Sequence, residues 1–318
     1  MEFAIRTFSS GDYQALATLA SLYAGTTVTA DALRWEDTTR DAKLRCQRWV
    51  AEVNGEVVGA GEHMQYAGIY HPRKFDVGVL VNPAFRGRGI GSALLETVMS
   101  ALAPLDPLTL TASARETCAE GIRFLTKRGY AERMRNWESH LDLTAFNPGA
   151  FAHLLERAAE QGYRLLSYAD LSYVPERDRK IYQLAQETRR DIPAPEPLTD
   201  IAFEEWVQLV LRRPYFWPEG YFIALKGDEF VGLSTLWSTD DEGLLTTGAT
   251  AVRRSHRGRG VARALKVRAL AHAKAAGYKR VKTWNESNNQ RMLAINDQLG
   301  FVRQPAWVVF QRKLAEER

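Results

Sequence analysis

The sequence predicts an α/β protein made of two tandem copies of one domain, each a mixed, mostly antiparallel sheet flanked by helices. Two basic glycine motifs begin at Arg86 and Arg257, which are 171 positions apart. Two further blocks end at Gly129 and Gly300, with the same spacing. An upstream hydrophobic block also recurs. Because the register holds across three blocks, the pattern indicates an internal duplication.

The joint between the copies is expected in residues 142–150, DLTAFNPGA, because the tripeptide Asn-Pro-Gly favours a turn. This places an N-terminal domain over residues 1–145 and a C-terminal domain over residues 150–318. A chain of 318 residues is long enough for two domains of ordinary size.

Each copy is predicted to contain a hairpin followed by a strand. In the first copy AEVNGEVVGAG turns at Asn54-Gly55, the strongest short hairpin signal, and in the second the turn falls at residues 226–228. Gly59 and Gly232 hold matching places in the two hairpins and are 173 positions apart. The strands that follow are expected over residues 76–81 and 244–252.

The strand leads in each copy into the glycine motif, a helix, a further strand and a last helix. In the second copy an alanine and leucine stripe marks the first helix, which is expected to stop at Gly277. In the first copy Pro104 ends the corresponding helix. This order of elements predicts a mixed sheet with helices packed on it.

Composition limits the class of protein. Hydrophobic residues make up 45% and charged residues 25%, which is typical of a globular chain. There is no apolar run of membrane-spanning length and no signal-peptide core, so we expect a cytoplasmic protein without a membrane partner. Cys46 and Cys118 form no disulfide framework, and neither cysteine nor histidine spacing indicates a metal site. Monomer and homodimer both remain open.

The glycine motifs predict an anion-binding site. Glycines after a strand allow a tight turn and a close approach of a ligand to the backbone. The first N–H groups of the following helix lack internal partners, and the helix dipole favours negative charge there. The two motifs consist of Arg86, Gly87, Arg88, Gly89, Ile90 and Gly91, and of Arg257, Gly258, Arg259, Gly260, Val261 and Ala262.

With this order of elements and these motifs, the chain resembles the GCN5-related N-acetyltransferases (GNAT), and the tandem arrangement resembles that of mycothiol synthase. The resemblance implies acetyl-CoA as cosubstrate, with its pyrophosphate on the loops. The pantetheine arm would lie along the preceding strand ends. Those ends are Leu80 and Val81 in the first copy and Thr250, Ala251 and Val252 in the second.

The copies differ in the last helix, where the resemblance implies a cofactor-side asparagine and a tyrosine four residues before the final glycine. The second copy has Asn289 at the first position but Asn296 at the second. The first copy has Cys118 and Leu125 there, so we expect it to be degenerate and the chemistry to lie in the second. Candidate catalytic residues in that copy are Glu242, Glu286 and Asn285.

These observations predict transfer of acetyl from acetyl-CoA to a primary amine of a small molecule by direct attack, in the C-terminal domain. One alternative is a non-catalytic acyl-CoA sensor or interaction protein, and another is mycothiol synthase itself. Nucleic acid binding is a weaker interpretation, because the RGRG motif occurs once per domain without interleaved aromatic residues.

Overall fold

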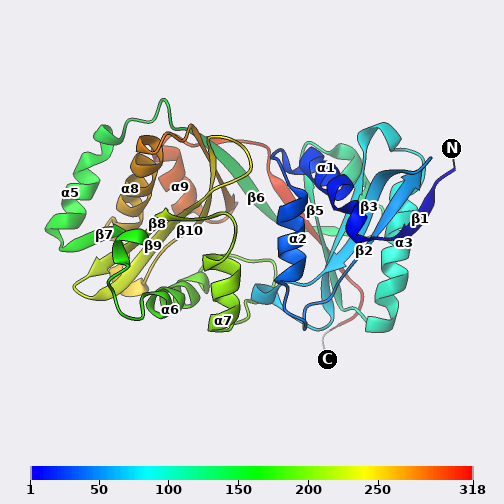
Figure 1. Ribbon diagram of the computed structural model, residues 1–318, viewed down its shortest axis with the longest axis horizontal. Coiled ribbons are helices and arrows are strands. Elements are labelled where there is room, and N and C mark those ends of the chain that lie inside the picture. The colour runs from blue at the N-terminus through cyan, green and yellow to red at the C-terminus, as the bar shows by residue number, and fades with distance from the viewer. Residues whose placement is uncertain (1, 317–318) are drawn as a thin grey trace. The chain divides into compact units, whose positions relative to one another are not determined.

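The computed structural model describes residues 2–316, and the chain divides into two compact units. The N-terminal unit contains the chain up to Arg135, the segment Pro195–Thr199 and the chain from Trp307. The C-terminal unit contains Asn136–Ala194 and Asp200–Ala306. Figure 1 shows both units and labels most of their helices and strands.

The N-terminal unit has a sheet in the order β1-β2-β3-β4-β5-β13, in which only β4 and β5 run parallel. Its elements are β1 (Ala4–Thr7), α1 (Tyr13–Ala24), α2 (Ala30–Thr38), β2 (Cys46–Val53), β3 (Glu56–Met64), β4 (Lys74–Val81), α3 (Ile90–Leu102), β5 (Thr109–Arg115), α4 (Ala119–Thr126) and β13 (Trp307–Lys313).

The C-terminal unit repeats this plan with the order β7-β8-β9-β10-β11-β6, β12 pairing with β6, and only β10 and β11 parallel. Its elements are β6 (Ala131–Asp142), α5 (Ala152–Glu160), β7 (Tyr163–Ser167), α6 (Arg177–Arg189), α7 (Phe203–Trp206), β8 (Phe216–Lys226), β9 (Glu229–Trp237), β10 (Leu244–Val252), α8 (Val261–Ala275), β11 (Arg280–Glu286), α9 (Gln290–Gln298) and β12 (Val302–Arg303).

The compact units do not coincide with the contiguous division at residues 145 and 150. Strand β6 pairs with β11 through its residues 136–142, so a segment before the expected joint belongs to the C-terminal sheet. Strand β13 pairs with β5 from Trp307 to Lys313, so the last strand of the chain belongs to the N-terminal sheet. Each sheet therefore includes a strand from the other sequence copy, β13 in the N-terminal sheet and β6 in the C-terminal sheet. A division of the chain by sequence position cannot predict this long-range pairing.

The hairpin prediction is confirmed in both copies. Asn54 and Gly55 join β2 to β3 with φ angles of 52° and 82°. Positive φ at both central residues is the type I′ geometry, which matches the twist of the flanking strands. Gly227, with φ of 59°, turns the chain between β8 and β9.

The parallel strands separate after three paired residues in each unit. In the N-terminal unit β4 pairs with β5 only over residues 74–76, and in the C-terminal unit β10 pairs with β11 only over residues 244–246. Beyond these positions the two parallel strands no longer pair with each other, so each sheet splits toward the glycine motif. The split positions a cleft at the strand ends.

Unlike β4, its counterpart in the N-terminal unit, strand β10 carries a bulge. Its register with β9 shifts between Thr247 and Thr250, which leaves Gly248 and Ala249 without partners in β9. Strand β4 pairs with β3 without interruption. At Gly248 a Cβ atom would lie 2.2 Å from Thr235 Oγ1 and 2.3 Å from Trp237 Nε1, so only glycine fits there.

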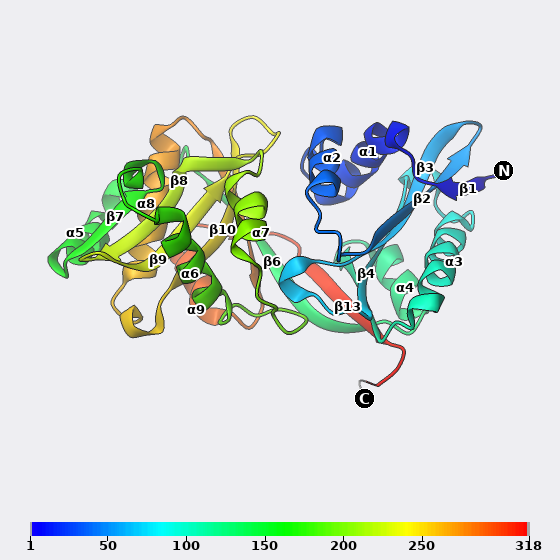
Figure 2. The ribbon, with the colours of Figure 1, turned by 60° about the horizontal axis from the view of Figure 1, so that its bottom comes forward.

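Helices cover both faces of each sheet (Figure 2). In the N-terminal unit α3 packs on one face through a core that includes Leu94 and Val98, and α1 packs on the other through Leu16. In the C-terminal unit α8 packs on one face and α6 and α7 on the other, where Trp206 is buried. This confirms the predicted mixed sheet flanked by helices.

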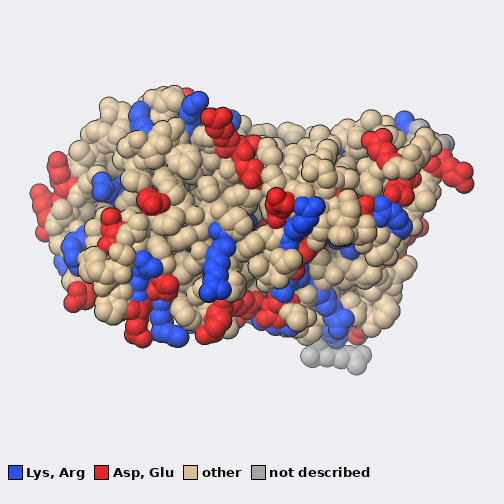
Figure 3. Space-filling view, viewed as in Figure 1, with Lys and Arg blue, Asp and Glu red and all other residues tan. Residues whose placement is uncertain are grey.

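Acidic and basic side chains are interspersed over the face of the molecule in Figure 3. Both signs occur beside each other rather than gathering by sign. Within residues 2–316, no helix has the length and apolar character that crossing a membrane requires.

Candidate acetyl-CoA sites

The two glycine loops have the same backbone geometry. Gly87 and Gly89 have φ angles of 74° and 84°, and Gly258 and Gly260 have 76° and 84°. Helices α3 and α8 begin at the next residue in each case. The positive φ values require glycine, and the free N–H groups of the first helical turn are directed at one place. Both copies therefore retain the anion-binding turn.

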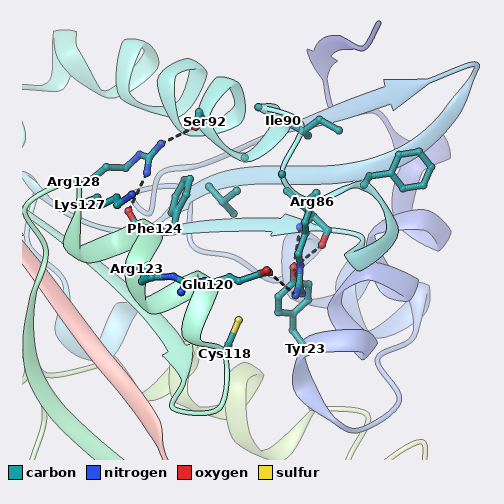
Figure 4. Close-up of a pocket in the computed structure, with 17 residues that line it drawn as sticks. Tyr23, Arg86, Ile90, Ser92, Cys118, Glu120, Arg123, Phe124, Lys127 and Arg128 are labelled. Carbon is teal, nitrogen blue, oxygen red and sulfur yellow. Dashed lines mark hydrogen bonds and ion pairs between the residues drawn. The ribbon is translucent and has the colours of Figure 1, made fainter. Parts of the chain in front are cut away.

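A cavity of about 580 Å³ lies beside the N-terminal loop, between the start of α3 and helix α4. Four basic side chains line it: Arg86, Arg123, Lys127 and Arg128. Arg128 donates to Ser92 Oγ at 2.7 Å, and Figure 4 shows these side chains around the loop. Several cations and free backbone donors fit the phosphates of coenzyme A.

Tyr23, from the end of α1, bridges this loop and strand β4. Its hydroxyl donates to the Val81 carbonyl at 2.6 Å and accepts from the Val81 N–H at 3.1 Å. Arg86 donates to the same hydroxyl at 3.0 Å, as Figure 4 shows. The backbone groups of Val81, to which the family resemblance assigns the pantetheine arm, are thus already satisfied by a phenol.

Behind Tyr23 a second N-terminal cavity of about 450 Å³ extends between the separated strands β4 and β5. Asp76 and Tyr130 both line it. Burial, with the Glu62 carboxylate as second cause, raises the pKa of Asp76 to about 7. The Tyr130 hydroxyl is buried and has no hydrogen-bond partner among the described residues, and burial raises its pKa to about 12.

The C-terminal loop lines a cavity of about 390 Å³, which we term the C-terminal loop cavity. Nine of the ten residues predicted to hold the cofactor in this unit line it, and Arg259 does not. They are Thr250, Ala251, Val252, Arg257, Gly258, Gly260, Val261, Ala262 and Asn289. The structure thus brings nine of these predicted residues together around one cavity.

Asp191, which follows α6, places a carboxylate in that cavity. Arg257 and Arg254 both pair with it, and Arg257 Nε also donates to the Val252 carbonyl at 2.9 Å. These two arginines hold the pKa of Asp191 well below its usual range. In each unit the first arginine of the glycine motif thus bonds a side chain at or just after the end of a helix. Arg86 bonds the phenol of Tyr23, and Arg257 pairs with the carboxylate of Asp191.

In the N-terminal unit six of the eight predicted residues line the 580 Å³ cavity, namely Val81, Arg86, Gly87, Gly89, Ile90 and Gly91. Leu80 lines the inner cavity instead, and Arg88 lies over the Phe85 ring. The glycine turn of this copy therefore also borders a cavity.

The three candidate catalytic residues do not line the C-terminal loop cavity. Glu242 is exposed, in the turn before β10. The Glu286 carboxylate accepts the backbone N–H and side-chain amide of Asn288, at 2.8 Å and 3.1 Å, and so closes the turn before α9. Asn285 accepts from Asn296 at 2.6 Å. These contacts shape the backbone around Asn289, which accepts from the N–H of Met292 at 3.4 Å and so caps α9.

Sequence reasoning missed Tyr23, Asp76 and Asp191. Asp76 stands as a lone acid in the apolar run KFDVGVLV, which was a visible signal. Tyr23 and Asp191 gave no local signal, because their roles depend on where a helix end meets a loop more than 60 positions away.

Comparison with known proteins decides the family. A model described as the acetyltransferase (GNAT) family matches residues 178–301, and one described as the acetyltransferase (GNAT) domain matches residues 45–132. The chain belongs to the GNAT acetyltransferase family. Two matches, one in each copy, confirm the tandem arrangement. They support an acyltransferase rather than the non-catalytic acyl-CoA sensor.

Related proteins agree with this tandem GNAT assignment. A mycothiol acetyltransferase from Thermobispora bispora is 26% identical over 243 residues, which cover 74% of this chain and 75% of that protein. A tandem GNAT protein from the clavulanic acid biosynthesis pathway, solved without AcCoA, aligns over the whole of both chains at 20% identity, with a TM-score of 0.76. A GCN5-related N-acetyltransferase from Sphaerobacter thermophilus has 19% identity and a TM-score of 0.73, over 99% of this chain and 97% of that one. At these identities the two structures show the fold.

Proposed function

We propose that this tandem GNAT transfers acetyl from acetyl-CoA to a primary amine of a small molecule, with the chemistry in the C-terminal unit. The observation that carries the assignment is the bulge at Gly248 and Ala249. It occurs beside Thr250, which lines the C-terminal loop cavity, and strand β4 of the other unit has no counterpart.

The bulge supplies what attack on a thioester needs. As nitrogen attacks the carbonyl carbon, negative charge develops on the carbonyl oxygen, and backbone N–H groups outside the strand ladder are the donors we assign to it. Removing one such donor typically costs about 10²- to 10³-fold in turnover. The unbroken register of β4 leaves the N-terminal unit without this device.

The proposal does not require the tyrosine whose position Asn296 occupies. The leaving thiol has a pKa of about 8.5, so it departs with little assistance. Because Glu286 closes the turn before α9 and Asn285, in β11, bonds to Asn296 in α9, we assign both residues to positioning Asn289 rather than to proton transfer. Glu242 has no assigned role.

The N-terminal unit is proposed to bind acetyl-CoA without turning it over. Its loop and basic side chains fit phosphates, while Tyr23 occupies the Val81 backbone groups. A bound pantetheine arm would have to displace this phenol. In the N-terminal unit we therefore expect the phosphates of acetyl-CoA to bind while binding of its thioester end is disfavoured.

Mycothiol acetyltransferase activity is the second candidate, favoured by the name of the relative that aligns over three quarters of its own length. Assaying that reaction beside a panel of simple amines separates the two candidates. Acetylation confined to the mycothiol precursor supports the second.

The test is a matched pair of glycine substitutions. Gly248→Ala places a methyl group 2.2 Å from Thr235 Oγ1 and disrupts the bulge, whereas Gly78→Ala, in β4, meets only the flexible Glu62 side chain at 3.1 Å. With thiol release as the readout, we expect Gly248→Ala to lower turnover by about 100-fold or more, and Gly78→Ala to change it less than twofold. Full activity in a folded Gly248→Ala protein refutes the assignment.

A further inference from the structure

The C-terminal unit has a second cavity, of about 250 Å³, on the face of the sheet that α6 and α7 cover. We term it the front cavity. Its floor includes the bulge residue Ala249, and it shares Thr188 and Ile192 with the C-terminal loop cavity. It is lined by Ala185, Gln186, Thr188, Arg189, Ile192, Ile201, Trp206, Val210, Tyr221, Leu233, Thr235, Trp237 and Ala249.

Tyr221 brings an unpartnered polar group to the front cavity. Its side chain is 3% exposed, and its hydroxyl makes no hydrogen bond to any described residue. Burial raises the pKa of Tyr221, so the phenol stays a neutral O–H group. The hydroxyl oxygen is not enclosed by protein atoms, and Tyr221 lines the front cavity, so this group can donate a hydrogen bond to a ligand atom there.

The remaining wall is apolar and aromatic, and the only charged side chain among the described lining residues is the guanidinium of Arg189. Burial lowers the pKa of Arg189, yet it remains a cation. No carboxylate is present in this lining to balance an ammonium group. The front cavity therefore disfavours a positively charged amine and favours an uncharged, apolar body.

We propose that the front cavity holds the acceptor, and that the acceptor is a weakly basic primary amine, of the α-amino type, attached to an apolar body about the size of one ring. This rests on the proposed acetyl transfer at the bulge. The volume is just below the range of about 300–1,000 Å³ usual for drug-sized ligands, which limits the body to a single ring or branched chain.

The basicity of the amine decides how much of it is ready to react. An α-amino group with a pKa near 7.7–8.0 is neutral in roughly one molecule in six to ten at pH 7. A lysine-type amine with a pKa near 10.4 is neutral in only about one in 2,500. Without a carboxylate base in the front cavity, the α-amino type has an advantage of a few hundred-fold.

The reaction step balances without a protein base. The neutral nitrogen bonds to the carbonyl carbon of the thioester, and the carbon–sulfur bond breaks. The sulfur leaves with the bonding electron pair as thiolate, and the proton lost by nitrogen passes to water or to that sulfur. Tyr221 supplies a hydrogen bond that orients the acceptor and undergoes no net proton change.

The first experiment compares four amines that vary ring and basicity independently: phenylalanine amide, glycine amide, phenethylamine and ethylamine. We expect the largest kcat/KM for phenylalanine amide, at least about tenfold above both glycine amide and phenethylamine, with ethylamine lowest. Equal rates for the two amides, or a preference for ethylamine, overturn the proposal.

The second experiment compares Tyr221→Phe with Tyr168→Phe. Tyr168 contacts the Tyr221 ring but lies outside the lining of the front cavity. Tyr221→Phe should raise KM for phenylalanine amide roughly 3- to 10-fold and leave acetyl-CoA affinity unchanged, while Tyr168→Phe leaves KM unchanged. If the front cavity is only a packing gap, Tyr221→Phe changes stability and not KM, which refutes the proposal.

Calorimetric titration with phenylalanine amide separates the two levels of inference. Binding that Tyr221→Phe weakens, without any acetylation, supports the front cavity as an amine site and contradicts the proposed function. Acetylation of amines without preference for ring or basicity supports the proposed function and contradicts the acceptor class.

Discussion

The two units share the glycine loop, the plan of the sheet and the early separation of the parallel strands, and they differ in the residues that line their cavities. Among the described lining residues, both loop cavities combine several basic side chains with one carboxylate, Glu120 in the larger N-terminal cavity and Asp191 in the smaller C-terminal one. The bulge at Gly248 and Ala249 in β10 has no counterpart in β4. The glycine turn is thus the same in both copies, whereas our proposal assigns acetyl-CoA capture without turnover to the N-terminal unit and the thioester chemistry to the C-terminal unit.

The units differ also in the charges inside their clefts. The N-terminal inner cavity is lined by Asp76 together with Arg86 and Arg115, whereas Arg189 is the one charged residue among the described lining residues of the C-terminal front cavity. Position 95 in α3 is leucine, and the position 171 residues later in α8 is the buried Lys266. Single substitutions of Arg86, Lys266, Asp76 and Asp191 test the comparison of the units, and their expected effects decrease in that order.

The largest effect is expected from Arg86→Ala. The side chain lines the 580 Å³ cavity, and a charge-assisted hydrogen bond contributes about 1.5–3 kcal/mol, so acetyl-CoA should bind the N-terminal unit roughly 10- to 100-fold more weakly. Arg88→Ala, outside that cavity lining, is the control and should change affinity less than twofold. Native mass spectrometry across an acetyl-CoA titration measures both, and equal weakening contradicts the cofactor-capture role.

Lys266→Leu should stabilise the protein by about 1–3 kcal/mol at pH 7. Burial lowers the pKa of Lys266 to about 8, so the folded state pays a desolvation cost that is full below pH 8 and disappears as pH rises toward 10.5. Denaturant unfolding at pH 7 and pH 10 measures the effect. A gain of the same size at both values contradicts this cause.

Asp76→Asn should stabilise the protein by about 1–2 kcal/mol above pH 7. The gain is limited because the side chain is half-buried and solvent screens its charge. The raised pKa, about 7 against 3.8, means the folded state holds the proton more tightly, so wild-type stability falls as pH rises from about 4 to 7. The variant should lack that slope in unfolding curves at pH 4, 6 and 8. An unchanged slope assigns it to other groups.

The smallest effect is expected from Asp191→Asn. Removing a carboxylate that pairs with Arg257 and Arg254 raises the positive charge at the C-terminal loop cavity, so acetyl-CoA should bind that unit about 2- to 5-fold more tightly. The gain should shrink with added salt. Weaker binding would mean that Asp191 serves mainly to orient the arginines.

Much of this comparison could be predicted from the sequence, because the repeat, the hairpin turns and the glycine motifs are local patterns. The change in repeat spacing from 173 to 171 positions also indicated a length difference between Gly59 and Arg86. This net difference is the sum of two changes in the structure. The connection between β9 and β10 is three residues shorter than that between β3 and β4, and β10 is one residue longer than β4. The bulge that distinguishes the units was therefore masked by a shorter loop.

The closing strands and the cavity contents could not be predicted in the same way. Strand β13 pairs with β5 across about 200 positions, and no local pattern encodes that choice. Both the sequence around Tyr221 and the burial of its side chain are typical of a core residue. Only the three-dimensional lining shows that it meets Thr235 and Ala249 around an open volume.

The central claim, that the constant loop supports turnover in one unit only, is tested most directly by Gly260→Ala against Gly89→Ala. Both glycines have a φ of 84° and open space around a new Cβ, so the two substitutions impose the same backbone strain. Turnover with acetyl-CoA and an acetylatable amine should fall at least about tenfold in Gly260→Ala and less than twofold in Gly89→Ala. Equal loss in both, or the larger loss in Gly89→Ala, would contradict the account.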